Sequence, residues 1–219
     1  GMNEAPGHSG HKTAAGPRKP IPIRADHTPD QCIPLDAYYN AALDDNFHLG
    51  GLEGNDLASF PKGTVNLAGV TFDVRGLIHL TGQQIETLSS IDYPQKVTNI
   101  IIGRKAEHLH FLHGAGWPSD EGQTIAKWTI YYDDGTENVI RVHYGKDVAD
   151  WWTAPDAPSL SGSQAAWEGE NAATRESSMQ LRLFKKAWNN PHPEKVIKAI
   201  DYTSSMKDSS PFMLAITAD

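Results

Sequence analysis

The strongest evidence for the fold class is the segment of residues 126–144, which reads AKWTIYYDDGTENVIRVHY. Both of its halves alternate apolar and polar side chains, which is typical of strands with one buried face. Between them lies DDGT, residues 133–136, where Gly135 can take the positive φ that a tight turn requires. The segment therefore predicts an antiparallel hairpin. One face of this hairpin is expected to carry Trp128, Ile130 and Tyr132, opposite Val139 or Ile140.

Short β-rich runs occur on both sides of this hairpin, separated by Gly, Pro, Asn, Asp and Ser. They lie at residues 65–67, 70–74, 77–80, 97–102, 109–112, 179–185, 196–202 and 212–217. No stretch keeps a helical periodicity over three turns, so the βαβ units of a parallel sheet are not expected. The sequence predicts an all-β fold, a jelly-roll β-sandwich of two antiparallel sheets.

The chain is expected to form one folded domain. Residues 1–34 are rich in Gly, Pro, His, Lys and Ala, so this segment is expected to be a flexible tail or linker. Residues 35–219 are then a single β-sandwich domain, which is long enough to bury a large core. Long loops are expected at residues 44–63 and 147–175, because both are rich in Gly, Pro and small polar residues.

The composition of the chain limits the kinds of partner that it can be expected to bind. The net charge is -8 and the pI is near 5.6, and no cluster of Lys and Arg offers a footprint for phosphates, so a nucleic-acid partner is not expected. Cys32 is the only cysteine, so an intrachain disulfide is impossible. Residues 1–31 contain no apolar run of the length that a signal peptide or a membrane span needs, so neither is expected.

Three histidines, His108, His110 and His113, lie close together, and imidazole is the commonest metal ligand in proteins. On a strand, His108 and His110 share a face, as the metal-binding histidines of a cupin jelly roll do. A cupin also has a Glu shortly after this pair, and residues 111–116 contain none. We therefore favour a strand that turns these histidines to solvent and its apolar residues inward.

Nucleophilic chemistry has little support in the sequence. Cys32 falls in or beside the expected tail, where no His and acid could be held around it. A Gly-x-Ser-x-Gly elbow and a phosphate-binding glycine loop are both missing from the sequence. The adjacent acids Asp133 and Asp134 lie on a hairpin tip, whereas a glycosidase needs its carboxylates in a cleft. The pattern favours a binding domain that requires no cofactor over an enzyme.

Tryptophans in the expected loops are the best candidates for a binding surface. Trp151 and Trp152 are adjacent, so their side chains point in opposite directions and a loop cannot easily bury both. Indole rings beside Asp and Asn suit sugars, because sugar C–H faces stack on aromatic rings while the hydroxyls form hydrogen bonds. The candidate ligand-binding residues are Trp151, Trp152, Trp167, Trp117 and Asp150.

Five motifs within residues 63–217 carry a resemblance to a known family. They are GVTFDVRG at 69–76, LHFLHG at 109–114, YYDDG at 131–135, GKD at 145–147 with DWW at 150–152, and WNNPHP at 188–193. Together they resemble a galactose-binding-like β-sandwich module, related to the domains called NPCBM. Such modules accompany bacterial glycoside hydrolases and envelope proteins.

The resemblance implies a jelly roll with its recognition loops at one end and a polysaccharide or glycan as the ligand. It also implies an attached or associated hydrolase or envelope protein and an extracellular or periplasmic location. Modules of this kind commonly hold a structural calcium near their first strands, and Ca²⁺ prefers carboxylate and amide oxygens. The candidate ligands in this sequence are Asp44, Asp45, Asn55 and Asp56, with Asn46 beside them.

Three functions stay open at this point. The favoured one is a non-catalytic carbohydrate-binding module that uses the loop tryptophans. The second is a protein-interaction or regulatory domain of the bacterial cell envelope, in which the same tryptophans contact another polypeptide. The third is a metal-dependent jelly-roll enzyme at His108 and His110.

Overall fold

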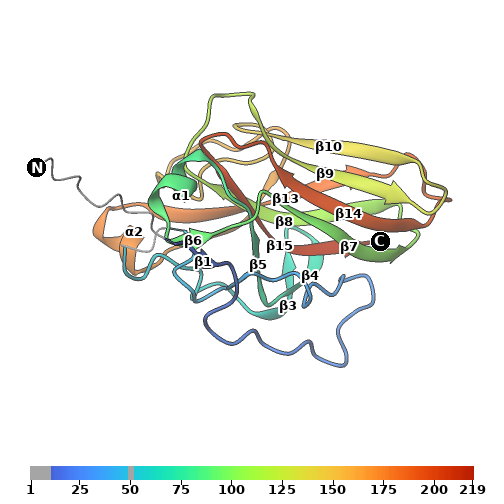
Figure 1. The fold of residues 1–219 in the computed structure, drawn as a ribbon, viewed down its shortest axis with the longest axis horizontal. Coiled ribbons are helices and arrows are strands. Elements are labelled where there is room, and N and C mark those ends of the chain that lie inside the picture. Colours follow the sequence, from blue (N-terminus) through green and yellow to red (C-terminus); the bar gives the residue numbers. More distant parts are fainter. Residues whose placement is uncertain (1–10, 49–51) are drawn as a thin grey trace, which may run out of the picture.

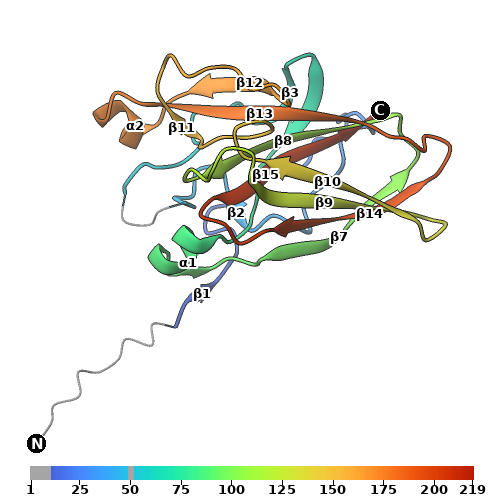
Figure 2. The same cartoon turned by 90° about the horizontal axis from the view of Figure 1, so that it is seen from above.

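The structure is a computed structural model that describes residues 11–48 and 52–219 (Figure 1). Strands make up 45% of the described residues and helices 5%, which confirms the prediction of an all-β protein. A four-stranded and a seven-stranded antiparallel sheet run along the long axis of the molecule (Figure 1, Figure 2). Their facing sides share one hydrophobic core, as in a β-sandwich.

The four-stranded sheet is built around the predicted hairpin, which is confirmed. Gly135 in its turn has a φ of 85°, and Trp128 pairs with Ile140. The order of the strands across the sheet is β10-β9-β14-β7. Their bounds are β7 Lys96–Arg104, β9 Thr124–Tyr132, β10 Glu137–His143 and β14 Ile197–Ser204.

The seven-stranded sheet has the order β11-β13-β8-β15-β5-β2, and β12 pairs with β13. Its strands are β2 Ala41–Ala42, β5 Gly76–His79, β8 His108–Gly116, β11 Trp152–Thr153, β12 Gln164–Gly169, β13 Gln180–Asn189 and β15 Ser210–Ala218. β11 and β12 fall within residues 147–175, which the sequence predicted as a loop. The apolar and aromatic side chains of β12 are only partly buried, so it is an edge strand with a weak sequence signal.

Smaller elements surround these sheets. A two-stranded antiparallel sheet covers part of the outer side, and a short parallel pair and two short helices complete the fold. Their bounds are β1 Thr13–Ala14, β3 Gly63–Leu67, β4 Val70–Val74, α1 Gln83–Leu88, β6 Ile91–Asp92 and α2 Ala172–Glu176. The helices and β11 lie toward one end of the molecule, and the C-terminus lies toward the other (Figure 1, Figure 2).

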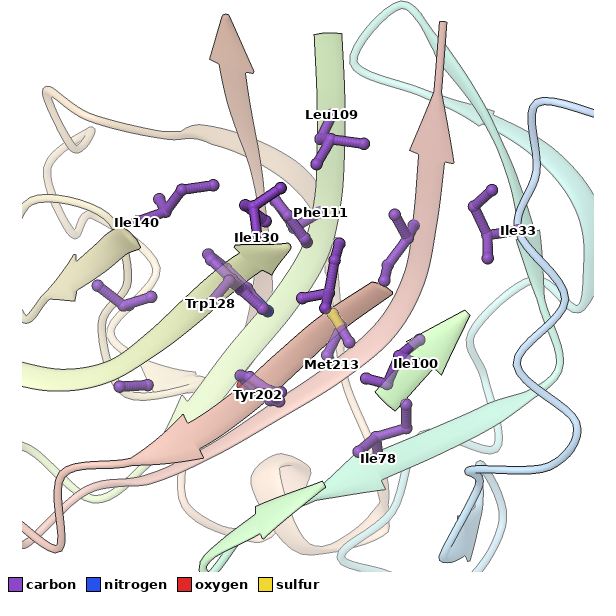
Figure 3. Packing of buried hydrophobic residues seen from close by; sticks show 14 of the residues in the cluster. Ile33, Ile78, Ile100, Leu109, Phe111, Trp128, Ile130, Ile140, Tyr202 and Met213 are labelled. Carbon is purple, nitrogen blue, oxygen red and sulfur yellow. The ribbon is translucent and has the colours of Figure 1, made fainter. Parts of the chain in front are cut away.

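Three aromatic rings stack among the aliphatic side chains that fill the space between the two sheets (Figure 3). The ring of Trp128 lies parallel to that of Phe111, with 3.9 Å between ring centroids, and also to that of Tyr202 at 5.5 Å. Trp128 and Tyr202 come from the four-stranded sheet and Phe111 from the seven-stranded sheet. Because burial of such large rings contributes strongly to core energetics, this stack helps to hold the two sheets together.

The outer side of the seven-stranded sheet is covered by a second hydrophobic cluster. Leu112 on β8 belongs to this cluster, whereas its neighbours Leu109 and Phe111 belong to the core between the sheets. The alternation along β8 therefore places His108, His110, Gly114 and Gly116 on the outer side with Leu112. Phe47 and Phe60, which lie outside the strands, pack on that side.

The N-terminal segment contributes to the folded unit from residue 11 onward, which differs from the tail expected there. Residues 1–10 of the expected tail lie outside the described residues. Cys32 and Ile33 are buried, and the N–H of Ile33 donates to the carbonyl of Ile216 at 2.9 Å. Arg24 forms an ion pair with Asp73 at 2.9 Å. The segment has few apolar residues of its own, but strand pairing and ion pairs with distant residues offset its ordering entropy.

Candidate functional site

Residues 150–153 lie between β8 and β13, where β8 ends and β13 begins. The N–H of Trp151 donates to the carbonyl of Ala115 on β8 at 2.7 Å, and the carbonyl of Trp151 accepts from the N–H of Arg182 on β13 at 2.9 Å. β11 then continues the pairing with β13. The motif DWW is therefore fixed by main-chain hydrogen bonds on both sides, which gives it a defined position at this end of the sheet.

A pocket of about 230 Å³ opens beside this inserted segment, and we call it the tryptophan pocket. Its described lining residues are His48, Leu52, Asn55, Trp117, Asp150, Trp151 and Trp152. Four of the five ligand-binding residues expected from the sequence are among them. The structure thus brings Trp117 together with the DWW motif, although more than 30 residues of sequence separate them.

The three indoles of the pocket differ in exposure. Trp117 and Trp152 are half-buried, whereas Trp151 is completely buried against Phe47 and Phe212. Trp151 is therefore a core residue whose ring closes the pocket from within, and it does not form the exposed platform that the sequence suggested. The faces left for a ligand belong to Trp117 and Trp152.

A hydrogen bond holds the ring of Trp152 in place, and another holds the main chain of Trp117. Trp152 donates its Nε1–H to Oδ1 of Asn55 at 2.9 Å, and this same oxygen accepts from Nδ2 of Asn171 at 3.1 Å. Trp117 has a φ of 61°, a left-handed conformation that favours glycine, and its carbonyl accepts from Oγ of Ser209 at 2.7 Å. A ring that is fixed by its own hydrogen bond, as that of Trp152 is, loses little entropy when a ligand binds.

Asp150 supplies the carboxyl group of the pocket. Burial raises the pKa of Asp150 to about 6, and hydrogen bonds from the main-chain N–H groups of Trp152 and Trp117 oppose this shift in part. The N–H of Trp152 donates to Oδ1 of Asp150 at 3.1 Å. A carboxyl group beside indole rings can accept hydrogen bonds from hydroxyl groups when it is ionised.

His48 forms another wall of the pocket, and sequence reasoning missed it. Its ring lies 3.9 Å from the ring of Trp117, between centroids, and directly over Gly116. Burial lowers the pKa of His48 to about 3, so the imidazole is neutral at physiological pH. A single histidine in an irregular segment carries no pattern in the sequence that could have assigned it to this place.

Trp167, and two residues that were considered for other chemistry, lie elsewhere. Trp167 packs on Phe60 in the outer cluster, with 4.8 Å between ring centroids, and is not a lining residue of the tryptophan pocket. His113 is completely buried in the core against the edge of Trp128. The Cys32 thiol is also buried, and this burial raises its pKa. The thiol donates a hydrogen bond to the carbonyl of Thr71.

The residues considered for calcium are divided between two places. Asp44, Asp45 and Asp56 line a surface hollow that also contains the cationic residues Arg18 and Lys19. Asn55 instead faces the tryptophan pocket. The carboxylate of Asp45 accepts hydrogen bonds from the N–H groups of Arg18, Lys19 and Ala42, which ties the N-terminal segment to the domain. The carboxylate oxygens of Asp45 therefore have a structural role.

Within the part of the chain that the structure describes, one group of three acidic or histidine side chains has the spacing of metal ligands. It consists of His108, His110 and Asp219, at the other end of β8. No described helix has the length and apolar character needed to cross a membrane. No protein-family model matches the chain, and no curated protein matches it.

Proposed function

We propose that the chain is a non-catalytic carbohydrate-binding module that takes one sugar ring into the tryptophan pocket. In this proposal the sandwich has the jelly-roll topology of galactose-binding-like modules. The observation that carries the proposal is the convergence of two half-buried indoles and a carboxyl group on one hollow. These groups belong to Trp117, Trp152 and Asp150.

The size and lining of the pocket support a small, ring-shaped ligand. Its volume of about 230 Å³ is below the ~300–1,000 Å³ of pockets for drug-sized ligands. A pyranose has apolar C–H faces for the rings of Trp117 and Trp152 and hydroxyl groups for Asp150. This geometry favours the end of a glycan chain, or a single branch residue, over the middle of a linear polysaccharide.

The number of carboxylates supports binding without hydrolysis. Asp150 is the one carboxylate among the described lining residues, whereas glycoside hydrolysis commonly uses a pair of carboxylates about 5–9 Å apart. His48, the other titratable group in the wall, is neutral and packed on Trp117. The pocket therefore offers recognition groups without a second acid.

The first test is calorimetric titration with galactose, glucose, mannose, N-acetylglucosamine and short oligosaccharides of each. We expect at least one to bind, and Trp152→Ala to weaken it about tenfold, which corresponds to ~1.4 kcal/mol. Trp167→Ala is the matched control, because Trp167 is also half-buried but lies outside the pocket. Heats that stay flat for the whole panel, or equal losses in both variants, would contradict the proposal.

The pKa of Asp150 predicts how sugar binding depends on pH. With a pKa of about 6, the carboxylate is almost fully ionised at pH 7.5 and about one-tenth ionised at pH 5. Because the ionised form accepts hydrogen bonds from sugar hydroxyls, affinity is expected to fall about tenfold across this range. Titrations at half-unit steps measure the midpoint. The Asp150→Asn variant should bind the sugar more weakly than the wild type at pH 7.5, and its affinity should show no transition near pH 6. A wild-type affinity that stays constant over this pH range would refute the role assigned to Asp150.

A further inference from the structure

The outer side of β8 carries a second group of polar side chains, at the opposite end from the tryptophan pocket. His108 and His110 lie two residues apart at the start of β8, while Gly116 at its end faces His48 of the pocket. Asp219 follows β15, the neighbour of β8 in the sheet. This group therefore takes no part in the proposed sugar site.

The side-chain atoms of this group already have the spacing of ligands around one small cation. Nδ1 of His108 lies 3.1 Å from Oδ1 of Asp219, and Nε2 of His110 lies 3.3 Å from each carboxylate oxygen. All three side chains offer a ligand atom within 4.8 Å of the others. Ligands at ~2.0–2.1 Å from a tetrahedral zinc ion are about 3.4 Å apart, so little rearrangement is needed.

Strand pairing holds the carboxylate beside the histidines. The N–H of Asp219 donates to the carbonyl of His108 at 3.1 Å, and the main-chain oxygen of Asp219 accepts from the N–H of His108 at 2.9 Å. The side chain of His110 is 11% exposed, whereas those of His108 and Asp219 are 44% and 46% exposed. One ligand is thus fixed by packing, and the other two leave an open path from solvent.

The donor set selects the class of ion. Two imidazoles with one carboxylate suit Zn²⁺ and its first-row neighbours, whereas Ca²⁺ and Mg²⁺ require mostly oxygen ligands. Three protein ligands also leave a coordination position for water, as in zinc sites that are open to solvent. His113, the third histidine of this run, is buried on the other side of the strand against Trp128 and cannot join them.

We propose that His108, His110 and Asp219 bind one divalent transition-metal ion of the Zn²⁺ class at the start of β8. Such an ion links β8 to the residue that follows β15, and it stabilises the folded state because the unfolded chain does not bring these ligands together. This site is independent of the proposed sugar site, since the two share no residue.

The test is calorimetric titration of the purified, metal-stripped protein with Zn²⁺ at pH 7.5. We expect one equivalent to bind to the wild type, with His110→Ala and Asp219→Asn weakening that event about 100-fold or more. His192→Ala is the matched control. His192 also lies beside a carboxylate, with its Nδ1 3.6 Å from Oε1 of Glu194, but among the described residues this pair has no third side chain at the spacing of a metal ligand. Its affinity for Zn²⁺ should equal that of the wild type.

Thermal unfolding separates metal binding from damage to the fold. Asp219→Asn keeps the size of a half-exposed side chain, so without metal its Tm is expected to match the wild type. Saturating Zn²⁺ should raise the Tm of the wild type and of His192→Ala but leave that of Asp219→Asn unchanged. The proposal is overturned if the wild type shows no stoichiometric Zn²⁺ binding, if Asp219→Asn binds as tightly, or if His192→Ala loses as much affinity.

Discussion

Trp151→Ala is expected to lower the free energy of unfolding by about 4 kcal/mol. The ring of Trp151 is completely buried, with its centroid 5.1 Å from that of Phe47 and 5.8 Å from that of Phe212. Because its main chain is hydrogen-bonded to both β8 and β13, the backbone cannot move to fill the cavity. Chemical denaturation followed by far-UV circular dichroism measures the change, which is a large part of the ~5–15 kcal/mol that stabilises a typical domain.

Trp152→Ala is the matched control for this loss of stability. Trp152 is the next residue and has the same side chain, but it is half-buried and faces the pocket. Its removal is expected to cost only about 1 kcal/mol, because less apolar surface leaves the interior. A Trp151→Ala protein as stable as Trp152→Ala would show that the assignment of Trp151 to the core is wrong.

Gly116→Ala is expected to distort the tryptophan pocket and to destabilise the domain by about 2 kcal/mol. A Cβ at this position would overlap the His48 ring, which is itself packed on Trp117. His48 must therefore move, and the wall that it forms with Trp117 moves with it. Loss of sugar affinity by calorimetry and a lower midpoint in chemical denaturation are the two measurements.

Two further variants make this result specific. Gly114→Ala introduces a similar overlap on the same strand, against Phe212 and Leu183, but not against a pocket residue. It should lose stability and keep its sugar affinity. Adding His48→Ala to Gly116→Ala removes the overlapping ring. The double variant should therefore lose less stability than the two single variants lose in sum. Purely additive effects would mean that the two residues are not in contact.

The four-stranded sheet could be predicted because each of its strands carries its own signal. In the β9–β10 hairpin, alternation marks the strands and Gly135 marks the turn, all within 19 residues. The three consecutive isoleucines of β7, Ile100 to Ile102, are likewise visible without knowledge of its partners. Such local information fixes where strands lie, but it does not specify the order in which they pair.

The N-terminal segment could not be predicted, because its order comes from distant residues. Its composition resembles a linker, yet Ile33 is paired with Ile216 and Arg24 with Asp73. The same limit applies to the site. The sequence identified Trp117, Asp150 and Trp152 as ligand-binding residues, and they line the pocket. Trp151 is instead buried, because residues 150–153 are inserted between β8 and β13. His48 reaches the pocket only because Gly116 leaves room for its ring.

The position of β15 also governs when this protein can fold during its synthesis. β15 comes last in the chain order of the strands, yet in the seven-stranded sheet it lies between β8 and β5. A nascent chain that still lacks it cannot join those two strands, and β8 then presents an unpaired, apolar edge. The seven-stranded sheet can therefore close only when β15 is available, and because this pairing joins residues far apart in the sequence, its formation is expected to be a slow step of folding.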